Sequence, residues 1–121
     1  MTKRILVVED HDDNLQILRD LLAITDYDMV EARDGEQALI AAARHPPDLI
    51  LMDIQLPLID GYEVTRRLKA NTALKDIPII VVTSYALSGD EEKAFAAGCD
   101  AYISKPYDPI ALLETIRQYL A

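Results

Sequence analysis

The sequence has no tryptophan, only four glycines and a single cysteine, Cys99. One cysteine cannot form an internal disulfide, so we expect a reducing compartment and a packing or turn role for Cys99. No G-x-G-x-x-G pattern occurs among the glycines, which argues against a dinucleotide site. No apolar run approaches the roughly 20 residues that span a bilayer, and no signal peptide precedes the first strand-like run. We therefore expect a cytoplasmic protein.

Basic residues are also scarce, since 12 lysines and arginines stand against 21 acidic residues, for a net charge of -9. Nucleic acids and anionic membranes are bound through clustered Lys and Arg, so we expect neither among the partners. The length of 121 residues, half of them hydrophobic, predicts one domain with a buried core over residues 1–121.

Five segments of the chain are strand-like. Three are short continuous apolar runs, which are typical of strands buried on both faces of a sheet. The other two mix polar and apolar residues and predict strands at the sheet edges. The apolar runs are 5–8, 49–52 and 79–82, and the weaker segments are 28–32 and 101–104.

Helical patterns alternate with these strands. Three of them open with a capping box, in which Asp or Ser is followed three residues later by Glu or Gln. These boxes begin at Asp34, Asp60 and Ser88. The first helix is expected at about 13–25, and the last follows Asp108, with proline at its favoured first position.

Strict alternation of strands and helices predicts a parallel sheet covered by helices on both faces, because each right-handed crossover returns its helix to one face. With the three most apolar strands in the centre, we select the order 2-1-3-4-5, which is known from flavodoxin-like folds. The predicted fold is a doubly wound α/β domain, (βα)5, with a central five-stranded parallel sheet.

Polar residues follow four of the expected strands. Ligands of such sheets bind beyond the carboxyl ends of the strands, so we expect these side chains to meet at one rim. They are Glu9 and Asp10 after the first strand, Asp53 after the third, Thr83 and Ser84 at the end of the fourth, and Lys105 after the fifth.

Three carboxylates and one ammonium sum to minus two, a repulsive cluster that one divalent cation would neutralise. Hard carboxylate oxygens suit Mg2+, with Mn2+ as the alternative, and magnesium leaves room for a phosphoryl group. Asp53 is the best candidate nucleophile, because a carboxylate can form a covalent aspartyl phosphate. For any single acid, a helix cap or a solvated loop charge is the alternative.

In combination, these motifs resemble a response-regulator receiver domain, and the resemblance spans essentially all 121 residues. It is carried by the acid pair Glu9-Asp10, Asp53 within LMDIQLP, Asp60-Gly61, Thr83 within VTS, and Lys105-Pro106. The resemblance implies a phosphorylation-dependent switch of a two-component system or phosphorelay. Such a protein is not an enzyme beyond its own phosphorylation and slow autodephosphorylation.

By this resemblance, Asp53 accepts a phosphoryl group from a phosphohistidine on a histidine kinase or histidine phosphotransferase. Asp10, Asp53 and the backbone carbonyl of Gln55 would ligate Mg2+, and Glu9 would act through a metal-bound water. His11 follows the acid pair, and we expect a solvated loop histidine there, with a metal ligand as the alternative, because the carboxylates already satisfy a magnesium site.

The resemblance also assigns the switch. Thr83 and Lys105 would contact phosphoryl oxygens, the Lys105-Pro106 bond is expected to be cis, and Tyr102 would turn inward when Thr83 moves. The output surface would comprise residues 87–97, 101–104 and 109–120 and would bind a downstream effector or kinase. We expect a monomer, with a dimer as the alternative, and no attached output domain.

Three rival functions are weaker. A flavin mononucleotide module needs a phosphate loop after the first strand, where residues 9–13 are acidic and would repel it. A haloacid-dehalogenase-type phosphatase needs a second Asp where Gln55 stands. A receiver-like binding module that signals without phosphorylation remains the alternative. Tyr85, close after Thr83, would slow hydrolysis of the phosphoaspartate.

Overall fold

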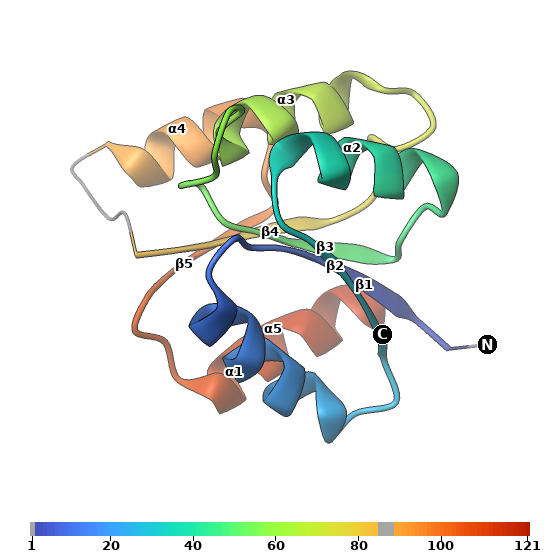
Figure 1. Cartoon of the computed structure of the whole chain (residues 1–121), viewed down its shortest axis with the longest axis vertical. Coiled ribbons are helices and arrows are strands. Elements are labelled where there is room, and N and C mark those ends of the chain that lie inside the picture. Colours follow the sequence, from blue (N-terminus) through green and yellow to red (C-terminus); the bar gives the residue numbers. More distant parts are fainter. Residues whose placement is uncertain (1, 85–88) are drawn as a thin grey trace.

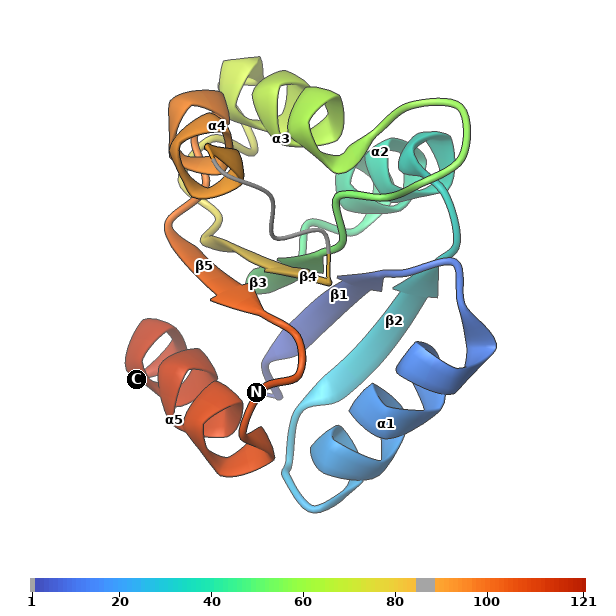
Figure 2. The ribbon, with the colours of Figure 1, turned by 90° about the vertical axis from the view of Figure 1, so that its left-hand side faces the viewer.

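The computed structural model describes residues 2–84 and 89–121. Its elements are β1 (Arg4–Val8), α1 (Asp12–Ala23), β2 (Asp28–Ala32), α2 (Gly35–Arg44), β3 (Leu49–Met52), α3 (Gly61–Ala70), β4 (Ile79–Thr83), α4 (Asp90–Ala97), β5 (Ala101–Ser104) and α5 (Pro109–Leu120). The strands form one parallel sheet in the order β2-β1-β3-β4-β5. Helices α1 and α5 cover one face, and α2, α3 and α4 cover the other (Figure 1 and Figure 2). The predicted doubly wound fold and strand order are confirmed.

The continuous apolar runs reflect burial of the central strands on both faces. Along β1, Leu6 and Val8 pack beneath α2, α3 and α4, whereas Ile5 and Val7 pack against α1 and α5. Each of these residues is at most 1% exposed. Successive strand residues point to opposite faces, so a strand between two helical layers needs apolar residues at every position. Within the described residues, no helix combines the length and apolar character needed to cross a membrane.

Two of the three predicted helix caps form. Asp34 accepts a hydrogen bond from the Gln37 N–H at 2.8 Å, and Asp60 accepts one from the Glu63 N–H at 2.9 Å. In neither helix does the Gln or Glu side chain accept the return hydrogen bond from the backbone N–H of the capping Asp. Gln37 Oε1 accepts instead from the backbone N–H of Arg33. Glu63 forms ion pairs with Arg66 and Arg67 in the next turn. Each cap therefore satisfies one helix N–H.

The predicted start of the fourth helix was wrong. Helix α4 begins at Asp90, and its N-cap is Gly89, which has a φ of 89° in the left-handed region that favours glycine. Ser88, where the capping box was expected, lies outside the described residues. The first helix is also shifted slightly, since α1 begins at Asp12 and ends at Ala23.

Backbone hydrogen bonds extend the sheet by one residue into the polar segments. The N–H of Glu9 donates to Ala32 and the N–H of Asp53 donates to Val8, both at 3.0 Å. On the other side of the sheet, Lys105 N–H donates to the Thr83 carbonyl at 2.8 Å. The first polar residue after β1, β3 and β5 is thus held by the sheet itself.

Gly61 allows α3 to start close beside the end of β3. Its N–H donates to the Ile54 carbonyl at 2.9 Å. A Cβ at this position would lie 2.2 Å from the Asp53 carbonyl oxygen and 2.8 Å from the Ile54 Cα. Both obstructing atoms are backbone, so a side chain cannot be accommodated without displacing the segment that carries Asp53.

We expect Gly61→Ala to lower the free energy of unfolding by about 2–3 kcal/mol, because this overpacking outweighs the better helix propensity of alanine. Gly35→Ala is the comparison, since its added Cβ would meet a Val64 methyl at 2.6 Å but no backbone atom closer than the Ile59 carbonyl oxygen at 3.1 Å, so we expect a smaller loss. Urea denaturation measures both. Equal losses for the two variants would contradict this explanation.

Candidate functional site

An ion pair joins the ends of two strands at the carboxyl edge of the sheet. Lys105 Nζ, just after β5, lies 2.8 Å from Glu9 Oε1, just after β1. The side chains are 14% and 3% exposed. A buried carboxylate remains ionised only when a partner offsets its desolvation. Lys105 therefore supplies the positive charge that lets Glu9 stay ionised in the protein interior.

Asp53 follows β3 and is only 5% exposed. Its Oδ1 accepts a long hydrogen bond of 3.4 Å from the Gln55 N–H. Burial, then the negative charge of Glu9, raises the pKa of Asp53 to about 6, although Lys105 opposes the rise. Burial also acts to raise the pKa of Glu9, but its bonds to Lys105 and to the His11 N–H outweigh this and lower it. Between these two acids, Asp53 is the one that takes up a proton first.

Asp10 carries an oxygen without a hydrogen-bond partner. Its Oδ1 is buried and receives no hydrogen bond from any described residue, although His11 Nδ1 lies 3.1 Å away. The His11 ring is 64% exposed. The charges of Asp10 and then Glu9 raise the pKa of His11. A buried, unpaired carboxylate oxygen is costly to desolvate, and a cation would relieve that cost.

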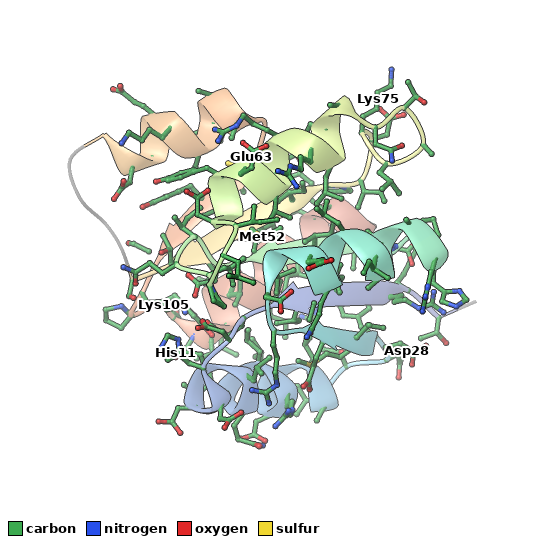
Figure 3. The ribbon with its side chains drawn as sticks, turned by 45° about the horizontal axis from the view of Figure 1, so that its top comes forward. His11, Asp28, Met52, Glu63, Lys75 and Lys105 are labelled. Carbon is green, nitrogen blue, oxygen red and sulfur yellow. The ribbon has the colours of Figure 1, made fainter. Side chains whose placement is uncertain are left out.

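These residues form a group that can hold a metal ion. Glu9, Asp10, His11 and Asp53 each offer one ligand atom, and these atoms lie within 4.8 Å of one another. Figure 3 shows His11 at the same end of the sheet as Lys105, with Asp28 at the opposite end. The three carboxylates supply the hard oxygen ligands that Mg2+ prefers. The predicted acidic site therefore fits this ion, and His11 lies close enough to remain a possible fourth ligand.

The other predicted site residues belong to β4, β5 and the loop after β3. Thr83 is the last residue of β4, is fully buried, and is in register with Ser104 of β5. Tyr102 of β5 is partly buried against the core beneath α4. Gln55 is exposed in the loop after Asp53. The Lys105-Pro106 peptide bond is cis, as expected. Tyr85, for which we predicted an effect on hydrolysis, lies outside the described residues.

Two features of α4 were not foreseen. Asp90, the first residue of the helix, is 3% exposed and accepts a hydrogen bond of 2.9 Å from Tyr62 Oη of α3. Phe95, the one large apolar residue of the helix, is 45% exposed, and the side chains of Ala94 and Ala97 are buried instead. No local sequence pattern distinguishes this Asp from its exposed acidic neighbours.

Cys99 has the structural role that its sequence context suggested. The residue is 6% exposed and belongs to the core beneath α2, α3 and α4. Burial, and then the neighbouring Asp100, raises the pKa of the thiol to about 11. The sulfur therefore stays protonated at neutral pH, which does not suit a nucleophile.

The raised pKa of Asp53 predicts a pH-dependent penalty on folding. Between pH 3.8, its ordinary pKa, and about 6, the folded state binds more protons than the unfolded state, so stability falls as pH rises. In EDTA, we expect Asp53→Asn to gain stability over wild type as pH rises through this window, by about 1–3 kcal/mol. Urea unfolding from pH 4 to 8 measures this difference.

Asp13→Asn, in an exposed residue of α1, controls for the loss of one negative charge. A stability difference between Asp53→Asn and wild type that stays constant from pH 4 to 8 would contradict the assignment.

The sequence and structure were compared with those of known proteins. Residues 5–117 match the response regulator receiver domain family. The chain is 48% identical over 120 residues to the polar-differentiation response regulator DivK of Brucella ovis, covering 99% of this chain and 98% of that protein. DivK of Brucella abortus matches to the same extent.

Solved structures agree with this relationship. A putative response regulator from Chloroflexus aurantiacus superimposes with a TM-score of 0.94 at 29% identity, covering 99% of this chain and 98% of that one. The receiver domain of a Pseudomonas aeruginosa sensor histidine kinase, with a magnesium ion coordinated in its active site cleft, gives a TM-score of 0.91 at 35% identity, with the same coverage. This chain belongs to the response-regulator receiver domain family, whose members are signalling switches of two-component systems.

Proposed function

We propose that this chain is a phosphorylation-controlled switch whose phosphoacceptor is Asp53, and that its donor is a phosphohistidine on a histidine kinase or histidine phosphotransferase. The observation that supports this most is the burial of Asp53 beside the Glu9–Lys105 ion pair and near an Asp10 oxygen that receives no hydrogen bond and lies 3.1 Å from His11 Nδ1. One edge of the sheet thus holds the proposed nucleophile, Asp53, a cation, Lys105, and a proposed ligand oxygen, Asp10 Oδ1.

Asp10, Asp53 and the backbone carbonyl of Gln55 would hold Mg2+, with Glu9 reached through a water molecule. The bound ion supplies positive charge that offsets the carboxylates and stabilises phosphoryl oxygens. The unpaired oxygen of Asp10 and the predominance of carboxylates support this choice. Mn2+, which accepts similar ligands, is the alternative ion.

In the transfer step, a carboxylate oxygen of Asp53 forms a bond to phosphorus while the P–N bond of the phosphohistidine breaks. The electron pair of that bond goes to the leaving imidazole nitrogen. Lys105, already largely removed from water, would donate a hydrogen bond to one phosphoryl oxygen, and the Thr83 hydroxyl would donate to another. Both groups contact the charge that the phosphoryl group adds.

Incubation with acetyl phosphate and Mg2+ tests the assignment. We expect intact-mass spectrometry to detect a gain of one phosphate in wild type and none in Asp53→Asn. Asp10→Asn should react at least about tenfold more slowly at limiting Mg2+, because one ligand charge is lost. Asp13→Asn is the matched control and should react like wild type. Repeating the reaction with Mn2+ and without a divalent ion identifies the ions that support it.

A wild-type protein that gains no phosphate from small donors or from histidine kinases would contradict the proposal. That result would favour the alternative, a receiver-like module that binds its partners without phosphorylation.

The output surface is proposed to be α4, β5 and α5, with Thr83 and Tyr102 as the switch residues. Of the range 87–97 expected for the first part, residues 87 and 88 lie outside the described chain. Helix α4 buries two alanines and Asp90 and leaves Phe95 half exposed, so little apolar area opposes its displacement. Phosphorylation would shift the balance between two positions of this helix and so alter binding of a downstream effector or kinase.

A groove beside Lys105 is the proposed docking site for the phosphohistidine donor. Its volume is about 480 Å³, and it lies between α1 and the segment that joins β5 to α5. Its walls include Ile17 on α1 and Pro106 and Tyr107 in the joining segment. Ile17 is 50% exposed. A donor histidine has to approach Asp53 past this groove, and exposed apolar side chains give its helix or loop a surface to pack on.

We expect Ile17→Glu to slow phosphorylation by a histidine kinase or phosphotransferase at least about tenfold, because a charge replaces an apolar contact. Its rate with acetyl phosphate should stay unchanged, since this small donor needs no docking surface. Ile24→Glu is the control, at the C-cap of the same helix and 70% exposed. If Ile17→Glu slows phosphorylation equally with the protein donor and with acetyl phosphate, the substitution acts on the chemical step and the docking proposal is contradicted.

Three broader predictions accompany this proposal. The DivK proteins match almost the whole of this chain. Those relatives are polar-differentiation response regulators by name, and a role in protein–protein signalling of the same kind is proposed here. A cytoplasmic location and a monomeric state, with a dimer as the alternative, stay predictions.

A further inference from the structure

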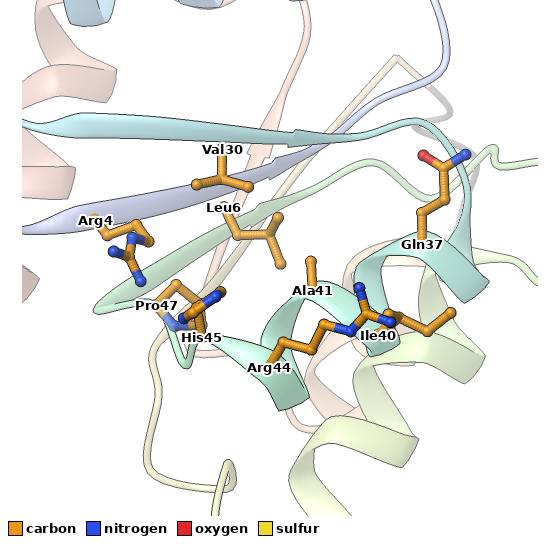
Figure 4. Close-up of a pocket in the computed structure, with 9 residues that line it drawn as sticks. All are labelled: Arg4, Leu6, Val30, Gln37, Ile40, Ala41, Arg44, His45 and Pro47. Carbon is orange, nitrogen blue, oxygen red and sulfur yellow. The ribbon is translucent and has the colours of Figure 1, made fainter.

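A second pocket runs along α2, and none of Glu9, Asp10 and Asp53 is among the residues that line it. It has a volume of about 440 Å³ and opens between α2 and the strands β1 and β2 (Figure 4). It is lined by Arg4, the first residue of β1, whereas Glu9 follows the last residue of the same strand. At about 3.3 Å per residue, five strand residues place Arg4 roughly 16 Å from Glu9, while the other end of the pocket reaches Gln37 in the first turn of α2. A ligand here would not touch the phosphorylation site.

The wall of this α2 pocket is apolar. Leu6 and Val30 belong to the sheet, and Ala41 and Ile40 come from α2, with buried Pro47 beyond the helix. Because β2 is an edge strand, no further strand covers this side of the sheet. The volume lies within the range of pockets that enclose small organic molecules. The size and the apolar lining therefore suit a small apolar group.

The rim of the α2 pocket is positively charged. Arg4 comes from β1 and Arg44 from the last turn of α2, as Figure 4 shows, and His45 follows Arg44. The Asp48 carboxylate lies beside this rim, because its Oδ2 accepts a hydrogen bond from the backbone N–H of Arg4 at 2.7 Å. It offsets part of the positive charge but forms no ion pair with either guanidinium group among the described residues. Two guanidinium groups also outweigh the partial negative charge at the C-terminus of α2.

Arg4 and Arg44, like Arg117 of α5, take part in none of the ion pairs between described residues, but only Arg4 and Arg44 line this pocket. Four arginines each lie within 3.0 Å of a carboxylate oxygen, namely Arg19, Arg33, Arg66 and Arg67. Across residues 2–84 and 89–121, neither Arg4 nor Arg44 has a carboxylate within ion-pair distance. In a chain with a net charge of -9, two such cations beside one apolar pocket are the groups that an external anion would pair with.

We propose that the α2 pocket binds a small organic anion with a flat apolar body. The body would pack on Leu6, Val30 and Ala41, and a carboxylate, sulfonate or phosphate group would pair with Arg4 and Arg44 at the rim. Guanidinium groups suit both parts of such a ligand, because they pair with anionic oxygens and stack on aromatic faces. Binding does not depend on phosphorylation of Asp53.

The probe for this site is 8-anilinonaphthalene-1-sulfonate, an aromatic anion whose fluorescence rises in apolar surroundings. Its neutral counterpart, N-phenyl-1-naphthylamine, lacks the sulfonate. We expect one sulfonate probe to bind per chain, and Arg4→Gln and Arg44→Gln each to weaken it about tenfold, as for a lost charged hydrogen bond. The neutral probe should bind more weakly and respond little to either change.

Three further variants make the result specific. Ala41→Leu should block both probes by filling the pocket, whereas Arg117→Gln on α5, across the sheet, should bind both like wild type. Asp53→Asn should also bind like wild type, so that failure of phosphorylation and failure of this proposal remain distinguishable. Circular dichroism and urea unfolding check that each variant is folded.

Amide chemical shifts locate the sulfonate probe. Shifts at residues 4–6, 30 and 40–45 are expected, and shifts confined to the groove beside Lys105 would overturn the proposal. If Arg4→Gln and Arg44→Gln both leave the affinity for the sulfonate probe unchanged, the proposal is also overturned, because the pocket would then bind the apolar rings and not the anionic group.

Discussion

The main constraint on this structure is the negative charge of several carboxylates that are buried at one edge of the sheet and must be offset by nearby positive charge. Glu9 and Asp53 are almost inaccessible to solvent, and parallel pairing of their strands brings both to the same edge. Lys105, delivered by β5 from the opposite side of the sheet, pairs with Glu9 and offsets part of the negative charge. Burial, and then the charge of Glu9, raises the pKa of Asp53, and Asp10 Oδ1 is buried without a hydrogen bond. That uncompensated charge explains why the edge suits a divalent cation.

The helices around this edge are attached in different ways. Helix α1 buries four leucines against the sheet, namely Leu15, Leu18, Leu21 and Leu22. Helix α4 has only small side chains on its buried face, apart from Asp90, which bonds to Tyr62. Apolar area removed from water is the main source of packing energy, so α1 is held much more firmly than α4. A firm α1 suits docking of a phosphoryl donor, and a weakly held α4 suits a conformational response.

Charge is distributed unevenly along the strands. The acidic cluster lies beyond the carboxyl ends of β1 and β3, whereas Arg4 and Arg44 lie near the amino end of β1. The two regions are connected through β1, which carries Leu6 in the wall of the α2 pocket and ends just before Glu9. A single rigid strand thus supports two sites that differ in both charge and polarity, which allows each to bind its own ligand.

Much of the fold followed from local patterns. Continuous apolar runs identified the three central strands, because only burial on both faces makes every position apolar. Asp34 and Asp60 marked helix starts through bonds formed within three residues. The start of α4 was not predicted, because its N-cap is a glycine in a left-handed conformation and Ser88 was the stronger local signal. The strand order was selected from known folds, and the structure agrees with it.

The sequence by itself determined which residue types stand at the strand ends, and hence that carboxylates and one lysine would meet at one edge. Only the tertiary structure decided which of them pair. Glu9 and Lys105 are 96 residues apart, and no local pattern states that they bond. The same holds for Tyr62 with Asp90 and for the placement of Arg4 beside Arg44. Such contacts depend on side-chain positions across packed elements, whereas strands and caps depend on neighbours in the chain.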